Sequence, residues 1–215
     1  CDLARMPHLL LAARSEAEKT DFLCSLLECF SKNEPSAVKF FLADSMKEDF
    51  LSFSNSPHLL SPVVSYDAAK VISSLNWIAI EMERRFQIFQ EHSVRDIQGY
   101  NVAKSEILPR IVVVISELGE LMIPRREETE MVLCRLCQLG RAAGIHLVIA
   151  TAHPAEQVLS GLIRANVPSR ISFAVFTVDE SRSILDQKGA EELKKGEILY
   201  LPLAAPKPMK IQFSR

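Results

Sequence analysis

Short apolar runs alternate with longer amphipathic segments along most of this 215-residue chain. Within each run the apolar residues occupy successive positions, which is typical of strands covered on both faces of a sheet. The expected strands are His8–Ala13, Val38–Ala43, Arg110–Ser116, Ile145–Thr151 and Arg170–Phe176. The expected helices are Thr20–Ser31, Tyr66–Glu91, Arg126–Ala143, Ala155–Arg164 and Asp179–Gln187. This alternation predicts a three-layer α/β fold with a mostly parallel sheet.

The end of the chain departs from this alternation. Glu197–Pro202 and Met209–Phe213 flank a proline-rich turn with no helix between them, so we expect an antiparallel C-terminal pair. Ser65 is the expected N-cap of the longest helix. With 48% hydrophobic residues the chain can fill a core, and one domain over residues 1–215 accounts for the whole pattern.

Composition limits the functions that the chain can have. The 25 Lys and Arg are offset by 27 Asp and Glu, which excludes a uniformly basic surface and restricts any nucleic-acid contact to a local patch. Of five cysteines, Cys134 and Cys137 form a C-x-x-C pair without a second pair at zinc spacing. We therefore expect core-facing thiols, a reducing cytosolic setting, and no zinc or haem site. No stretch approaches the ~20 apolar residues of a membrane span, although the lack of an initial Met leaves an upstream anchor open.

The turn after the first expected strand carries the first candidate motif. A phosphate-binding loop reads G-x-x-x-x-G-K-[ST] between a strand and a helix. Lys19 and Thr20 occupy the last two positions, but Ala13 and Glu18 stand where the glycines belong. From these residues alone, a solvated helix N-terminus explains the turn better than a nucleotide site does.

Longer segments, in order along the chain, identify the lineage. They are D-L-A-R-M-P-H-L-L at 2–10, P-H-L-L-S-P-V-V at 57–64, E-M-E-R-R at 81–85, G-Y-N at 99–101, R-A-A-G-I-H-L at 141–147, G-L-I-R-A-N-V-P-S-R at 161–170 and S-R-S-I-L-D-Q at 181–187. Together they resemble the motor domain of the FtsK/SpoIIIE family of hexameric DNA translocases. The resemblance implies a RecA-like P-loop NTPase fold.

The departures from that family gather at the nucleotide site. Where the family has G-T-T-G-S-G-K-S, residues 13–20 read A-R-S-E-A-E-K-T. Ser116 replaces the magnesium-directing Asp of the Walker B strand, although the following acid is retained as Glu117. The family's D-P-K becomes D-S-M at 44–46, and its A-T-Q-R-P becomes A-T-A-H-P at 150–154. Asp44 stays a candidate pocket residue, with helix or turn capping as the alternative.

These changes oppose phosphate binding in two ways. A non-glycine residue in the left-handed conformations of such a loop costs about 1–2 kcal/mol, which Glu16 and Glu18 would have to bear. A glutamate carboxylate 4 Å from a phosphate charge is repelled by about 4 kcal/mol at an effective dielectric constant near 20. We expect Lys19 to pair with these local acids in place of a nucleotide.

The resemblance implies candidate roles for residues that the pattern alone does not assign. ATP would contact Arg14, Ser15, Lys19 and Thr20 of the degenerate loop, and Thr20 would also face Mg²⁺. Glu117 would polarise the attacking water.

Four arginines have implied roles outside the loop. Arg182 would act in trans as an arginine finger on a neighbouring subunit. Arg164, Arg170 and Arg141 would face a DNA channel or a subunit seam, and their spacing does not decide between the two.

Three functions stay open from the sequence. The first is a pseudo-ATPase that serves as a ring or assembly subunit, the second an active translocase in chromosome segregation and cell division with an unusual P-loop, and the third a module of a secretion-system ring ATPase. Expected partners are other RecA-like subunits, in a homo- or hetero-oligomeric ring, and double-stranded DNA. The segment would make no direct membrane contact and would be cytoplasmic, with any tether to the inner face of the membrane supplied by other segments.

Overall fold

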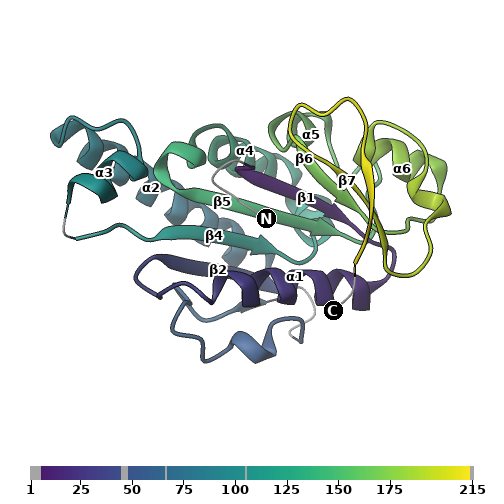
Figure 1. Cartoon of the computed structure of the whole chain (residues 1–215), viewed down its shortest axis with the longest axis horizontal. Coiled ribbons are helices and arrows are strands. Elements are labelled where there is room, and N and C mark those ends of the chain that lie inside the picture. The colour runs from purple at the N-terminus through teal and green to yellow at the C-terminus, as the bar shows by residue number, and fades with distance from the viewer. Residues whose placement is uncertain (1–5, 45–47, 66, 105, 214–215) are drawn as a thin grey trace.

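An eight-stranded sheet forms the centre of the computed structural model, which describes residues 6–44, 48–65, 67–104 and 106–213 (Figure 1). Its spatial order is β3-β2-β4-β5-β1-β6-β7-β8. The strands are β1 (His8–Ala12), β2 (Val38–Asp44), β3 (Val64–Ser65), β4 (Arg110–Ile115), β5 (Ile145–Thr151), β6 (Ser169–Ser172), β7 (Glu197–Leu201) and β8 (Met209–Gln212). The pairs from β3 to β6 are parallel and the last two pairs are antiparallel, which confirms the predicted fold class.

Helices cover both faces of this sheet. They are α1 (Glu16–Phe30), α2 (Ala68–Glu91), α3 (Ile97–Ala103), α4 (Gly119–Ala143), α5 (Gly161–Asn166) and α6 (Val178–Leu185). Figure 1 shows α1 in front of the sheet, with α2 and α4 behind it. Along β1, Leu9 and Leu11 pack with α1, whereas Leu10 joins the core on the α2 and α4 side. Because both faces are covered here, β1, β2, β4 and β5 are apolar at most successive positions.

Several boundaries differ from the sequence-based expectation. Ser65 does not cap α2, because it ends β3, and the carboxylate of Asp67 accepts the N–H of Lys70 instead. The helix expected from Ala155 begins at Gly161, since residues 155–160 form a turn that ends in the N-cap Ser160. The short elements α3 and β3 were not predicted.

The α4 helix begins earlier than predicted, at Gly119, and it is interrupted. Arg125, directly after Pro124, has φ −145° and ψ 56°, which is not helical. Proline lacks the N–H that a helix interior needs and clashes with the preceding turn, so a break at this point is expected.

One buried arginine joins three segments on the α2 side of the sheet. The Arg85 guanidinium donates to Glu81 at 2.9 Å, to the carbonyl of Pro109 at 2.8 Å and to that of Ala143 at 2.8 Å. Burial lowers the pKa of Arg85, against the opposing effect of its bond to Glu81. The contacts fix α2 to the segment before β4 and to the end of α4.

Gly144 ends α4 in a conformation that requires glycine. Its φ is +75°, and a Cβ at this position would come within 2.4 Å of the Ile97 side chain. A side chain at residue 144 would therefore meet both backbone strain and a steric clash.

The cysteines only partly match the prediction of core-facing thiols. Cys24 is buried, Cys134 and Cys137 are half-buried, and Cys29 is exposed, whereas Cys1 lies outside the described residues. Burial, with a smaller effect of Cys134, raises the pKa of Cys137 to about 12. Within the described ranges, no three His, Cys, Asp or Glu side chains come together so as to hold a metal ion.

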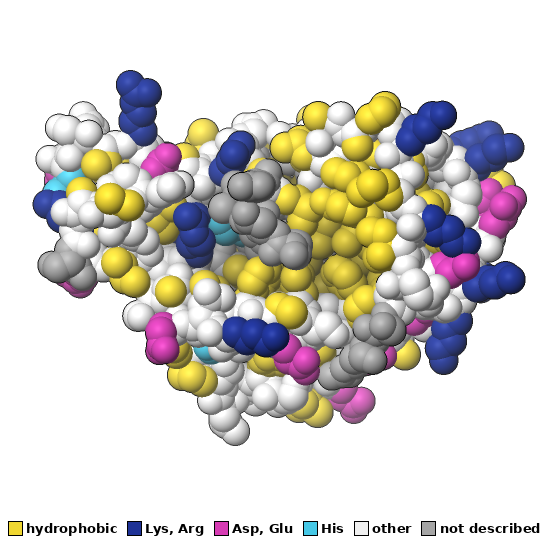
Figure 2. All heavy atoms as spheres, viewed as in Figure 1, with side chains coloured by type: hydrophobic (Ala, Val, Ile, Leu, Met, Phe, Trp, Pro, Cys, Tyr) yellow, Lys and Arg dark blue, Asp and Glu magenta, His cyan; other side chains and the backbone are white. Residues whose placement is uncertain are grey.

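Two surface features bear on partners. Figure 2 shows a broad apolar area on one face, with Lys and Arg side chains around it and several of them towards the end that carries α6. In the part of the chain that the structure describes, no helix has both the length and the apolar character needed to cross a bilayer.

Candidate functional site

The loop between β1 and α1, residues 13–15, is shorter than the phosphate-binding motif predicts. β1 ends at Ala12 and α1 begins at Glu16, so the helix starts four residues before the expected position at Thr20. Ser15 is the N-cap, and its hydroxyl accepts the N–H of Glu18 at 3.4 Å. Glu16 and Glu18 stabilise the first turn, because negative side chains there complement the helix dipole. The residues that replace glycines thus extend the helix into the loop.

Backbone donors in this loop are bonded within the protein. The N–H of Ala13 donates to the carbonyl of Thr151, and that of Arg14 donates to the carbonyl of Ala174. The N–H of Lys19 donates to the carbonyl of Ser15 at 3.0 Å. All of residues 13–20 are described, and none has the positive φ on which a phosphate-cradling loop draws.

Lys19 is buried, and its ammonium lies between two carboxylates. The Nζ atom is 2.6 Å from Glu16 Oε2 and 3.0 Å from Glu117 Oε2. Burial disfavours the charge on Lys19, but attraction to Glu117 and the hydrogen bonds that the ammonium donates to both glutamates outweigh burial and raise the pKa of Lys19. The predicted pairing of Lys19 with local acids is therefore confirmed for Glu16.

Glu18 differs from that expectation. Its Oε1 atom accepts the N–H of Gly196 at 2.8 Å, in the turn before β7. Gly196 has a φ of +78°. Glu18 therefore links the start of α1 to the C-terminal hairpin and makes no ion pair with Lys19.

Glu117 accepts four hydrogen bonds. Oε1 accepts the hydroxyl of Thr151 at 2.6 Å and the N–H of Gly119 at 3.1 Å. Oε2 accepts the N–H of Ala152 at 2.7 Å and the ammonium of Lys19 at 3.0 Å. This carboxylate holds the ends of β4, β5 and α1 together, and it would have to give up a bond to orient a water.

The two positions that would direct magnesium are also altered. The Thr20 hydroxyl donates to Asp49 Oδ1 at 2.7 Å. Ser116 is buried at the end of β4 and brings no charge to the site. Against a triphosphate with its Mg²⁺, the backbone N–H groups of Ala13, Arg14, Glu18 and Lys19 are bonded within the protein, the lysine is paired, and Ser116 supplies no metal-directing carboxylate.

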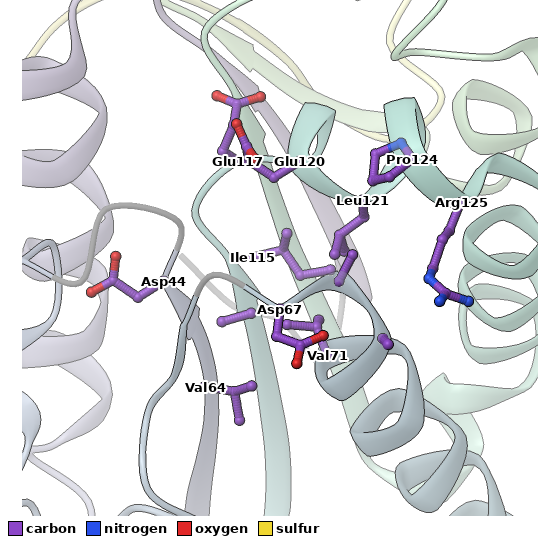
Figure 3. A pocket seen from close by; sticks show the side chains of 13 residues that line it. Asp44, Val64, Asp67, Val71, Ile115, Glu117, Glu120, Leu121, Pro124 and Arg125 are labelled. Atoms are coloured by element: carbon purple, nitrogen blue, oxygen red, sulfur yellow. The ribbon is translucent and has the colours of Figure 1, made fainter.

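A pocket of about 310 Å³ opens beside Glu117, between the N-terminus of α2 and the first turns of α4 (Figure 3). Four carboxylates line it, from Asp44, Asp67, Glu117 and Glu120. Arg125 is the only Lys or Arg in its described lining. Asp44 Oδ2 accepts the N–H of Phe50 at 3.2 Å, so the capping alternative applies to it as well.

The remaining predicted residues do not join this site. Arg14 is exposed at the loop. Arg182 is exposed on α6 and forms an ion pair with Asp179 at 3.4 Å. Arg164 is half-buried and lies 3.6 Å from Asp186.

Arg170 does not fit the predicted contact with DNA. It is buried, and its guanidinium donates to Asp186 at 2.6 Å and to the carbonyls of Arg164 and Ile184. A buried cation with these partners closes the junction of α5, β6 and α6.

Sequence reasoning missed Asp49, Thr151 and the N–H of Ala152 as partners of the site. Thr151 ends a strand that was expected to reach this edge of the sheet and Ala152 follows it, which was the one available signal. Asp49 comes from a segment without any regular pattern.

The chain has a RecA-like three-layer α/β fold, which it shares with solved proteins of conjugation and secretion systems. It superposes on the pCW3 conjugation coupling protein TcpA, solved with ATPγS, with a TM-score of 0.81 and 24% identity, over 99% of this chain and 61% of that one. With the type VII secretion ATPase EccC of Thermomonospora curvata the TM-score is 0.84 at 21% identity, over 97% of this chain and 25% of that one. At these identities the likeness concerns the fold alone.

The sequence comparisons establish the family. The FtsK/SpoIIIE family model matches residues 1–156. The chain is 46% identical over 214 residues to the DNA translocase FtsK of Caldanaerobacter subterraneus subsp. tengcongensis, covering 98% of this chain and 30% of that protein. It is 39% identical over 223 residues to the DNA translocase SpoIIIE of Bacillus subtilis, covering 98% of this chain and 28% of that protein. The chain belongs to the FtsK/SpoIIIE family and spans about 30% of the length of these relatives.

Proposed function

We propose that residues 1–215 form one RecA-like motor domain that acts as a ring or assembly subunit and does not turn over ATP itself. The observation that carries the proposal is the burial of the Lys19 ammonium between Glu16 and Glu117. In a nucleotide-binding loop this cation reaches the β- and γ-phosphates. Here two protein carboxylates take their place.

Electrostatics and backbone geometry support the same conclusion. A phosphate entering beside Lys19 would meet the Glu16 carboxylate, with a repulsion of about 4 kcal/mol at 4 Å and an effective dielectric constant near 20. It would also have to compete for the N–H of Lys19, which is bonded within α1. ATP and Mg²⁺ follow from the family, and we propose that this cradle holds neither tightly.

The proposed partners come from the relatives, which are DNA translocases. We propose that homologous subunits assemble with this one in a ring around double-stranded DNA. Arg182 is exposed and would reach a neighbour's ATP as an arginine finger, which gives the chain a role while its own cradle is inactive. The segment would lie on the cytoplasmic side, with any membrane tether outside it.

An active ATPase is the second candidate. Lys19, Thr20 and Glu117 lie at the same edge of the sheet, as such an enzyme requires. The Glu16 side chain is 51% exposed, so it can turn towards solvent and uncover Lys19. A secretion-ring module is the third, favoured by the close match in fold to EccC.

Calorimetric titration with ATP, with and without Mg²⁺, tests the proposal. We expect no saturable binding at millimolar nucleotide. Replacement of the loop residues by glycine at 13, 16 and 18, together with Ser116→Asp, should restore measurable affinity, because it returns both the backbone donors and the metal-directing charge. Tight, Mg²⁺-dependent binding by the natural chain that is lost in Lys19→Ala would refute the proposal.

A mixing experiment tests the role in assembly. Addition of the chain to an active relative should change its DNA-dependent ATPase rate, and Arg182→Ala should abolish that change. Arg126→Ala, on the exposed side of α4, is the matched control. An unchanged rate with the natural chain would argue against a shared ring.

A further inference from the structure

A second concave site lies at the opposite edge of the sheet from the degenerate loop. It is an open pocket of about 480 Å³ between α2, α3 and the last turns of α4. Figure 1 shows α3 beside the C-terminal end of α2, at the edge where β4 begins. Arg110 opens β4 at this edge, whereas Glu117 follows its other end, roughly 17 Å away at the rise of a parallel strand. The two sites are therefore separate.

The walls of this pocket combine apolar, amide and cationic groups. The lining residues are Phe86, Asp96, Ile97, Gln98, Arg110, Gln138, Leu139, Arg141 and Ala142. Phe86 and Leu139 supply an apolar wall, and the two glutamines supply amides. The volume is in the range of pockets for small organic ligands.

The two arginines set this pocket apart. Among the described residues, neither Arg110 nor Arg141 has a carboxylate at ion-pair distance, even though Asp96 lines the same pocket. The Asp96 carboxylate caps α3 and accepts the N–H of Gly99 at 2.8 Å. Most other arginines of the chain do have such partners: Arg84, Arg85, Arg125, Arg126, Arg135, Arg164, Arg170 and Arg182.

We propose that this pocket, here called the α2–α4 pocket, binds a small organic phosphate with an aromatic or apolar body. The planar guanidinium fork matches phosphate oxygens in geometry and charge. Phe86 and Leu139 would cover the organic part, and the amides of Gln98 and Gln138 would complete the polar contacts. The proposal does not depend on the state of the cradle at Lys19.

Phenyl phosphate is a suitable probe because it joins one phosphate to one aromatic ring. Titration of the ¹⁵N-labelled chain should shift the backbone amide signals of residues 86, 96–98, 110 and 138–142. Inorganic phosphate tests the anion without a body, and benzyl alcohol tests the body without the anion. We expect both to bind at least tenfold more weakly than phenyl phosphate.

Substitutions assign the contacts. Arg110→Gln with Arg141→Gln should weaken phenyl phosphate binding at least tenfold, and the corresponding Lys pair should restore part of it, because it keeps the charge and loses the fork. Arg126→Gln with Arg135→Gln removes the same charge from exposed positions on α4 outside both pockets and should leave binding unchanged. Thermal unfolding followed by circular dichroism checks that each variant is folded.

Three results would overturn the proposal. The first is unchanged affinity in the folded Arg110/Arg141 variant. The second is an equal loss in the Arg126/Arg135 control, because binding would then follow total charge. The third is a binding pattern that does not fit an organic phosphate in the α2–α4 pocket, shown either by equal affinity for inorganic phosphate or by shifts centred on residues 13–20.

Discussion

Replacement of Lys19 by Met tests whether the lysine of this motif stabilises the fold. Methionine keeps the length and apolar stem of lysine and removes the ammonium. Loss of the ammonium leaves the Glu117 carboxylate without a cation, although the hydroxyl of Thr151 and the N–H groups of Gly119 and Ala152 still donate to this carboxylate. In a cradle kept open for nucleotide, the same change would cost little or even stabilise the protein.

The structure sets the expected magnitude. The Lys19 side chain is 1% exposed and that of Glu117 is 16% exposed, so their pair is largely buried. Breaking a buried pair costs about 3–5 kcal/mol, and the remaining donors to Glu117 place this case near 3 kcal/mol. For a domain of this size the melting temperature should fall by about 6–12 °C. Glu16→Gln, at a half-exposed partner, should cost less than about 1 kcal/mol.

Urea unfolding of Lys19→Met, Glu117→Gln and the double variant measures the pair directly. The loss of unfolding free energy in the double variant should be smaller than the sum of the losses in the two single variants by at least about 1 kcal/mol, because the double variant leaves no charge unpaired. The raised pKa of Lys19 means that its stabilisation is fully present below the usual value of 10.5 and is lost as pH rises through the higher folded value. The difference between the natural chain and Lys19→Met should therefore be constant from neutral pH to about pH 10. An unchanged or raised melting temperature in Lys19→Met would refute this reasoning.

Three further predictions concern other parts of the fold. The buried His8 has a pKa lowered to about 4 by burial and a neighbouring histidine, so stability should fall by about 3 kcal/mol as pH drops from 6.5 to 4, and His8→Asn should remove this part of the acid profile in urea titrations. Gly144→Ala should destabilise by at least about 2 kcal/mol in thermal unfolding, whereas Gly161→Ala, where a Cβ meets nothing within 4 Å, should change stability by less than about 0.5 kcal/mol. Exposed Cys29 should react with a thiol reagent well before Cys137, whose pKa is raised to about 12 by burial.

Each of these has a result that contradicts it. An acid profile that is the same with and without His8 would show that the pKa of this imidazole is not lowered in the folded chain. An equal loss of stability in Gly144→Ala and Gly161→Ala would show that the positive φ and the close contact at Gly144 do not require glycine. If Cys137→Ser removed the fast phase of the thiol reaction and Cys29→Ser did not, the fast-reacting thiol would be Cys137 and the prediction would be wrong.

The sheet was predictable because its signal is local. Four of the core parallel strands, β1, β2, β4 and β5, are apolar at most successive positions, and covering both faces of a sheet favours this. The fifth, β6, reads S-R-I-S, and the apolar residues that predicted it lie mainly after its end. The C-terminal pair was found from the absence of a helix between two short runs. The two-residue β3 and the seven-residue α3 carry too few residues for a periodic pattern.

The site was predictable in its residues and only partly in its contacts. Lys19 and Glu117 were identified through their positions in the motif, and the pairing of Lys19 with Glu16 follows from their i, i+3 spacing in a helix. The bond between Glu18 and Gly196 joins residues 178 positions apart, so no local pattern predicts it. The buried state of Arg170 likewise depends on Asp186, which approaches only after β6 and α6 have packed.

The contacts of Arg85 have a consequence for how the molecule opens. The guanidinium of Arg85, on α2, donates to a carbonyl before β4 and to a carbonyl at the end of α4. If any of these three segments moved, the buried guanidinium would lose hydrogen bonds that water could not replace. Local unfolding at this junction therefore has to be concerted, and fluctuations that begin at the end of α4 are transmitted to α2 and to the chain before β4 as a single cooperative event.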